Sequence, residues 1–185
     1  MKVVESDLPG CLVLEPRVFE DARGFFYESF NRDKLAAAGL TPQFVQGNVS
    51  RSSRGVLRGL HFQNPKAQGK LVSVLEGEVW DVAVDVRRGS PHFGRWTAVV
   101  LSADNKRHFW IPEGFAHGFV TLSGQALFTY LCTDTYDPAA DTGIRWDDPQ
   151  LAIDWPVAEP LLSDKDARLP LLAEVPVERL PTWEG

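Results

Sequence analysis

The chain has 185 residues, a formal net charge of −6 and a sequence pI near 5.2, which predict one acidic folded domain over residues 1–185. The negative charge argues against nucleic-acid binding and against attraction to an anionic membrane. Cys11 and Cys132 are too few for a disulfide scaffold, and the start of the sequence lacks the apolar core of a signal peptide, so we expect a cytoplasmic protein.

Short strands separated by turn residues are predicted along most of the chain, with one helix near the N-terminus. Asn31 can cap this helix over residues 32–38, and Gly39 can end it. The predicted strands are residues 12–14, 25–30, 44–46, 56–62, 70–75, 78–85, 96–101, 116–122 and 126–133. Many short strands at close spacing favour an all-β fold, an antiparallel barrel or jelly roll.

From about residue 154 onward, the C-terminal region differs in composition from the rest of the chain. Prolines recur there and prevent long regular elements, although Ser163 can cap a single turn. The residues between these prolines are apolar, so we expect this Pro-rich tail to pack against the body. In residues 78–86, apolar side chains alternate with Asp81, Ala83 and Asp85, which predicts a strand with one wetter face.

The strand over residues 56–62 contains Arg58 and His61 between apolar neighbours. Burying a guanidinium and an imidazole is costly unless each has a partner, and a cavity that needs a fixed cation beside a titratable ring is one reason to accept that cost. Because histidine titrates near neutral pH, His61 suits proton transfer. The alternative is a core histidine with satisfied hydrogen bonds beside a surface arginine.

Other candidates for acid–base chemistry each have a structural alternative. Lys70 begins a strand, where it could support a developing oxyanion or simply be solvated. Tyr130 lies on an apolar strand and needs a partner or a cavity for its hydroxyl. Ala116 and Gly118 flank His117 with little bulk, which predicts open space around its ring. Arg23 and Glu28 lie at a turn and on the strand that follows it.

Metal binding and nucleophilic catalysis find little support in the residue pattern. No two of the four histidines lie one residue apart on a strand, and the cysteines form no CxxC pair, so no metal ligand set is predicted. There is no Gly-x-Ser-x-Gly elbow and no glycine-rich phosphate loop before a helix.

Five ordered motifs between about residues 8 and 170 resemble the dTDP-4-dehydrorhamnose 3,5-epimerase family. They are residues 21–28 (DARGFFYE), 55–63 (GVLRGLHFQ), 68–72 (QGKLV), 110–119 (WIPEGFAHGF) and 163–166 (SDKD). The resemblance implies a cupin-like jelly roll that forms a homodimer with shared active sites and needs no metal or other cofactor. The substrate would be a dTDP-linked 4-keto-6-deoxyhexose on the route to dTDP-L-rhamnose, a precursor of lipopolysaccharide O-antigens.

The resemblance also implies roles for individual residues. His61 would be the general base, Asp166 its orienting carboxylate, Tyr130 the acid on the opposite face of the sugar, and Lys70 the cation beside the C4 oxygen. The remaining family positions would hold the sugar, diphosphate or thymidine, some of them in the partner's site. These substrate-binding positions are Arg23, Glu28, Gln46, Asn48, Arg58, Lys70, His117, Asp141 and Lys165.

Some residues depart from the family pattern. Gly47 and Val49 replace bulkier polar residues beside Gln46 and Asn48, which would reshape that wall, and Leu131 stands where a basic residue often occurs. Asp141 is one methylene shorter than the usual glutamate.

Three other functions stay open. A relative could invert only C3 or only C5 with the same catalytic residues. A non-catalytic jelly roll could bind carbohydrate through Arg58 and aromatic side chains. A metal-dependent cupin oxygenase is the third, although the histidine spacing argues against it.

Overall fold

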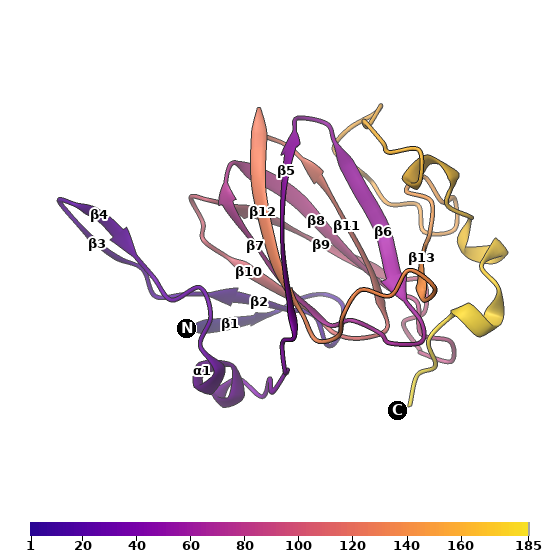
Figure 1. The fold of residues 1–185 in the computed structure, drawn as a ribbon, viewed down its shortest axis with the longest axis horizontal. Coiled ribbons are helices and arrows are strands. Elements are labelled where there is room, and N and C mark those ends of the chain that lie inside the picture. Colours follow the sequence, from indigo (N-terminus) through magenta and orange to yellow (C-terminus); the bar gives the residue numbers. More distant parts are fainter. Residues whose placement is uncertain (185) are drawn as a thin grey trace.

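The computed structural model describes residues 1–184, which form two antiparallel β-sheets packed face to face (Figure 1). The six-stranded sheet has the order β1 (Lys2–Glu5), β2 (Leu12–Glu15), β10 (His108–Ile111), β7 (Lys70–Glu76), β12 (Gln125–Cys132) and β5 (Gln46–Ser53). The five-stranded sheet has the order β13 (Asp141–Gly143), β6 (Leu57–Gln63), β11 (Phe115–Thr121), β8 (Glu78–Asp85) and β9 (Trp96–Ser102). This is the predicted all-β, cupin-like jelly roll.

A two-stranded arm and one helix precede the main sheets. Strands β3 (Phe19–Asp21) and β4 (Gly24–Phe26) pair only with each other and extend away from the body (Figure 1). The predicted helix is confirmed as α1 (Arg32–Ala37). The Asn31 side chain accepts a hydrogen bond from the backbone N–H of Lys34, and Gly39 follows the helix with a φ of +80°.

The core has two layers because the five-stranded sheet is covered on both faces. Between the sheets, Val72 and Phe128 from one sheet pack against Ala83 and Phe119 from the other. This jelly-roll interior continues into the cavity described below.

The C-terminal tail covers the outer face of the five-stranded sheet (Figure 1). Leu172, Val175 and Leu180 of the tail lie in the same buried cluster as Val82 and Val84 of β8. Burial of such side chains contributes about 1.5 to 3 kcal/mol each, which explains why a proline-rich segment stays attached. The packed tail is thus confirmed.

The tail contains three single-turn 3₁₀ helices, η1 (Asp166–Arg168), η2 (Leu172–Glu174) and η3 (Val177–Arg179). Just before the first of them, whose N-cap residue is Lys165, Ser163 Oγ accepts a hydrogen bond from the Asp166 backbone N–H at 3.1 Å. None of the helices formed by residues 1–184 has the length and apolar composition needed to cross a membrane.

The prediction of a wetter face on β8 was wrong. Asp81 and Asp85 are both fully buried on the inner face of the sheet, where Asp81 bonds to His117 and Asp85 to Arg87. The alternation correctly separated two faces, but both faces are covered and the carboxylates have internal partners.

Several strand boundaries also differ from prediction. The strand expected at residues 44–46 is β5, Gln46–Ser53; its inward side chains are polar and therefore lack the apolar alternation of a strand. The strand expected at residues 25–30 is the shorter β4, which ends at Phe26. Strands β1, β3, β10 and β13, each of three or four residues, were not predicted.

Candidate active site

A cavity of about 340 Å³ opens between the two sheets. Strands β5, β7 and β12 supply one wall, strands β6 and β11 the other, and the loops before β13 and η1 form its rim. The residues that line it are Ser50, Arg58, His61, Phe62, Gln63, Gln68, Lys70, His117, Phe119, Phe128, Tyr130, Tyr136, Asp141, Ser163, Lys165 and Asp166.

His61 and Asp166 form a dyad although they are 105 residues apart in sequence. His61 Nε2 donates to Asp166 Oδ1 at 2.5 Å, and Ser163 Oγ donates to the other carboxylate oxygen at 2.9 Å. Burial raises the pKa of the Asp166 carboxyl, but hydrogen bonds from His61 and Ser163 outweigh burial and hold that pKa below its ordinary value. An ionised Asp166 fixes the proton on Nε2, which leaves Nδ1 free to accept one.

Tyr130 reaches the same cavity from the opposite sheet. It lies on β12 with Asn48 and Val72 as its cross-strand neighbours, whereas His61 lies on β6 of the other sheet. Burial raises the pKa of the Tyr130 phenol, so the hydroxyl keeps its proton at neutral pH. An imidazole and a protonated phenol therefore face one space from two sides.

Lys70 is the buried cation of the cavity, with only 6% of its surface exposed. Burial lowers the pKa of its ammonium, and the charges of Asp141 and Asp81 oppose this effect without cancelling it. Such a group gains stabilisation when negative charge develops nearby, as on an enolate oxygen.

A second histidine–carboxylate pair lies next to the first. His117 is the cross-strand neighbour of His61, and its Nε2 donates to both oxygens of Asp81 at 3.0 and 3.1 Å. Burial raises the pKa of Asp81, which His117 and Lys70 counteract. Asp81 was not predicted as a site residue; its signal was a carboxylate inside an apolar strand, the same signal that identified Arg58.

Glycines beside His117 also let two neighbouring strands approach each other closely. A Cβ built on Gly118 would lie 2.7 Å from the Arg58 carbonyl oxygen, and one on Gly59 would lie 2.5 Å from the Gly118 Cα. The glycines thus allow β6 and β11 to touch, and the open space predicted around the ring of His117 is the cavity that it lines.

Charged groups gather at the rim of the cavity. Arg58 is held by a hydrogen bond from its Nε to Ser52 Oγ at 3.0 Å. Lys165 forms an ion pair with Asp141, and the Tyr136 hydroxyl donates to the same carboxylate oxygen at 3.1 Å. Tyr136 was not predicted, because one tyrosine in a polar loop has no sequence pattern.

Gln46 and Asn48 lie on β5 beside the cavity but not among its lining residues. Gln46 Nε2 donates to Asn48 Oδ1 at 3.1 Å, and Gln46 Oε1 accepts from the Tyr136 backbone N–H at 2.8 Å. Gly47 and Val49 alternate with them and face outward, and Val49 is 66% exposed, so they do not reshape this wall as predicted.

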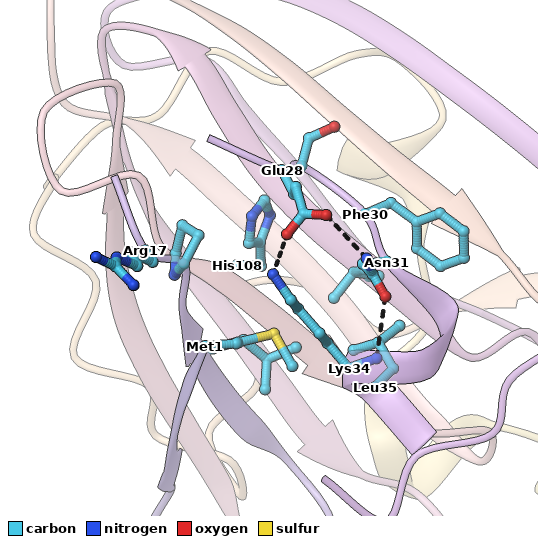
Figure 2. A pocket seen from close by; sticks show the side chains of 12 residues that line it. Met1, Arg17, Glu28, Phe30, Asn31, Lys34, Leu35 and His108 are labelled. Carbon is cyan, nitrogen blue, oxygen red and sulfur yellow. Dashed lines mark hydrogen bonds and ion pairs between the residues drawn. The ribbon is translucent and has the colours of Figure 1, made fainter. Parts of the chain in front are cut away.

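Arg23 and Glu28 lie outside this cavity. Arg23 forms an ion pair with Asp21 on the exposed arm. Glu28 binds Lys34 and Asn31 in a separate small pocket against the outer face of the six-stranded sheet (Figure 2). These two residues do not reach the candidate active site of their own chain.

Residues 1–184 contain no group of three or more His, Cys, Asp or Glu side chains placed to hold a metal ion. The two histidines of the cavity each have a single carboxylate partner, Asp166 or Asp81.

Comparison with known proteins gives a consistent family. Residues 5–174 match the family model described as dTDP-4-dehydrorhamnose 3,5-epimerase. The chain is 55% identical over 168 residues to the dTDP-4-dehydrorhamnose 3,5-epimerase of Shigella flexneri, covering 90% of this chain and 93% of that one. It is 50% identical over 179 residues to the dTDP-4-dehydrorhamnose 3,5-epimerase of Methanothermobacter thermautotrophicus, covering 95% of this chain and 97% of that one.

Solved structures agree with these relatives. The fold superposes with a TM-score of 0.97 and 52% identity on a dTDP-6-deoxy-D-glucose-3,5-epimerase from Legionella pneumophila in complex with dTDP-4-keto-L-rhamnose, covering 100% of this chain and 99% of that chain. A 3'-monoepimerase from Streptomyces bikiniensis in complex with dTDP-quinovose is more distant. It superposes with a TM-score of 0.87 and 38% identity, covering 95% of this chain and 91% of that chain. The chain therefore belongs to the dTDP-4-dehydrorhamnose 3,5-epimerase family.

Proposed function

We propose that the protein epimerises C3 and C5 of dTDP-4-dehydro-6-deoxy-D-glucose to give dTDP-4-dehydro-L-rhamnose, and that it does so in the cytoplasm. One observation carries this proposal: His61 and Tyr130 face a single cavity from opposite sheets, with Lys70 buried in its wall. The dTDP-4-keto-L-rhamnose bound to the Legionella pneumophila structure supports this substrate class. The two free, buried cysteines suit a reducing compartment.

The chemistry follows from the acidity of the substrate. The C3 and C5 protons both lie beside the C4 ketone, so removal of either gives an enolate with its charge on the C4 oxygen. His61 takes the proton, and Asp166 stabilises the imidazolium that forms. Lys70 stabilises the oxyanion, and Tyr130 returns a proton from the other face, which inverts the centre.

Deuterium labelling tests this function. We expect the protein, incubated with dTDP-4-keto-6-deoxyglucose in heavy water, to place deuterium at both C3 and C5, because each inversion passes through an enolate that is quenched from solvent. Proton NMR reads both positions. Deuterium at one centre only would indicate a monoepimerase like the Streptomyces bikiniensis enzyme, and at neither a binding protein.

We further propose a homodimer in which the arm of one subunit completes the site of the other. Phe25 and Phe26 on the arm are 60% and 65% exposed, a large apolar area for a free surface. Arg23 lies at the tip of this arm, where it cannot reach the cavity of its own chain. A second subunit would bury the phenylalanines and receive the guanidinium near its bound diphosphate.

Subunit complementation tests the shared site. Arg23→Ala and His61→Ala should each be inactive alone. When they are mixed and allowed to exchange subunits, half of the dimers are mixed, and each mixed dimer has one site with both residues intact. Activity should therefore return to about one quarter of the wild-type value. No recovery, with exchange demonstrated by mass spectrometry of differently tagged subunits, would place Arg23 in its own subunit's site or outside any site.

A further inference from the structure

Arg179, near the C-terminal end of the tail, holds the backbone beside the candidate active site. Its guanidinium donates to three consecutive carbonyl oxygens, those of Ala139 at 2.8 Å, Ala140 at 3.1 Å and Asp141 at 3.0 Å. A planar guanidinium with several donors in a fixed fork suits such a contact, whereas an ammonium does not present donors in this geometry. Arg179 also lies beyond residues 5–174, the span that matches the family model.

The backbone that Arg179 holds lies at the edge of the five-stranded sheet, and the Ala140 carbonyl oxygen also accepts from the Asn64 backbone N–H at 3.2 Å. Asp141 begins β13, which has only three residues and pairs with β6 alone at the edge of its sheet. Short edge strands and the loops before them open most readily in native proteins. Hydrogen bonds from one guanidinium to three carbonyl groups would therefore reduce the mobility of this segment more than they would reduce that of a central strand.

Asp141 connects this segment to the cavity rim. Its carboxylate forms the ion pair with Lys165 and accepts the hydrogen bond from the Tyr136 hydroxyl. Lys165 and Tyr136 both line the cavity, one offering an ammonium for a phosphate group and the other an exposed ring for a base. The Asp141 carboxylate therefore contacts both side chains.

The tail fixes Arg179 from both sides. The Glu178 carbonyl oxygen accepts a hydrogen bond from Asn64 Nδ2 at 3.2 Å. Beyond Arg179, Leu180 is buried, and the Pro181 carbonyl oxygen accepts from the Arg88 backbone N–H at 2.7 Å. The guanidinium is therefore presented from an anchored segment.

We propose that Arg179 is a positioning residue for nucleotide binding, acting through Asp141 on Lys165 and Tyr136. This inference rests on the proposed function, since it takes the rim of the cavity as the place where the dTDP part of the substrate binds. Arg179 itself touches neither the cavity nor the reacting atoms. Its removal should loosen the rim and weaken nucleotide binding while the proton transfers at His61 and Tyr130 continue.

The test compares affinity with turnover. For Arg179→Ala we expect about a tenfold rise in both the Kd for dTDP, measured by titration calorimetry, and the KM for the sugar nucleotide, with kcat within twofold of wild type. Arg179→Lys should fall between the two proteins, because an ammonium replaces only part of the fork, and it serves as the second variant if Arg179→Ala does not fold. Unchanged Kd and KM in a folded variant would overturn the proposal.

A matched control and a mutant cycle separate positioning from general stability. Arg88→Ala removes a side-chain hydrogen bond to Thr182 in the same tail, at 3.3 Å, but no contact with residues 139–141. It should leave Kd and KM unchanged, and an equal rise there would overturn the specific role of Arg179. In an Asp141→Ala background, Arg179→Ala should add little further loss, whereas full additivity would contradict action through Asp141.

The measurements on wild type and on Arg179→Ala distinguish loss of the proposed function from loss of the positioning role. If the wild-type protein binds dTDP but labels neither C3 nor C5, the proposed function fails, and the Kd values still decide the role of Arg179. If wild type turns over and Arg179→Ala has wild-type Kd and KM, only the positioning role fails.

Discussion

His61→Ala is expected to lose deuterium exchange at both C3 and C5 by about a thousandfold or more, because a positioned general base contributes roughly 10² to 10⁴ in rate and the neighbouring His117 is already bonded to Asp81. The protein should stay folded. The His61 side chain is 33% exposed, and when the imidazole is removed the buried Asp166 carboxylate keeps its hydrogen bond from Ser163 Oγ. The loss is read by NMR in heavy water and the fold by circular dichroism.

Tyr130→Phe gives the matched contrast. It keeps the ring and removes only the hydroxyl, so His61 can still abstract a proton and return one to the same face. Exchange should persist at a reduced rate while inversion falls much further. Equal loss of exchange and inversion would contradict a pure acid role for Tyr130. The control is His92→Ala, a histidine outside the cavity that hydrogen-bonds Arg95 and should leave both rates unchanged.

The sequence predicted most of the fold because the local signals agreed with the tertiary structure. The strands that contain Lys70, His117 and Tyr130 read as apolar runs, and each is a central strand of a sheet. The strand β5 was placed wrongly for a physical reason: its inward side chains, such as Asn48 and Ser50, are polar, and Ser50 lines the cavity rather than the apolar core.

The site itself was predicted unevenly. The sequence pattern made His61 a candidate beside a core-histidine alternative, whereas the pairing of His61 with Asp166 spans 105 residues and came only from the family resemblance. Asp81 was assigned to a wetter face, since a carboxylate paired inside the molecule and one in water look alike in sequence. Arg179 shows the same limit, because its contacts are to backbone carbonyl groups and therefore have no residue pattern.

Lys70→Met is expected to slow turnover by about a hundredfold and at the same time to stabilise the fold. The slower turnover follows from loss of the cation beside the C4 oxygen, a contribution of about 3 kcal/mol in the transition state. The added stability follows from burial, which lowers the pKa of Lys70 below its ordinary value of 10.5. Replacing a charged group in this position by an apolar side chain of similar length should raise the free energy of unfolding by about 1 to 2 kcal/mol at pH 7.

The sign of the pH dependence separates this explanation from a packing effect. The folded protein loses the Lys70 proton at lower pH than the unfolded chain, so the wild-type protein regains stability as pH rises from the folded pKa towards 10.5. The difference in free energy of unfolding between Lys70→Met and the wild type should therefore shrink between pH 7 and pH 10. Urea unfolding, followed by tryptophan fluorescence, measures it. Lys2→Met, at an exposed ion pair with Glu15, should show no such gain. A destabilised Lys70→Met protein would mean that the ammonium holds the cavity together. A more stable fold together with slower turnover would mean that the buried charge serves the reaction, because the folded protein would be more stable without it.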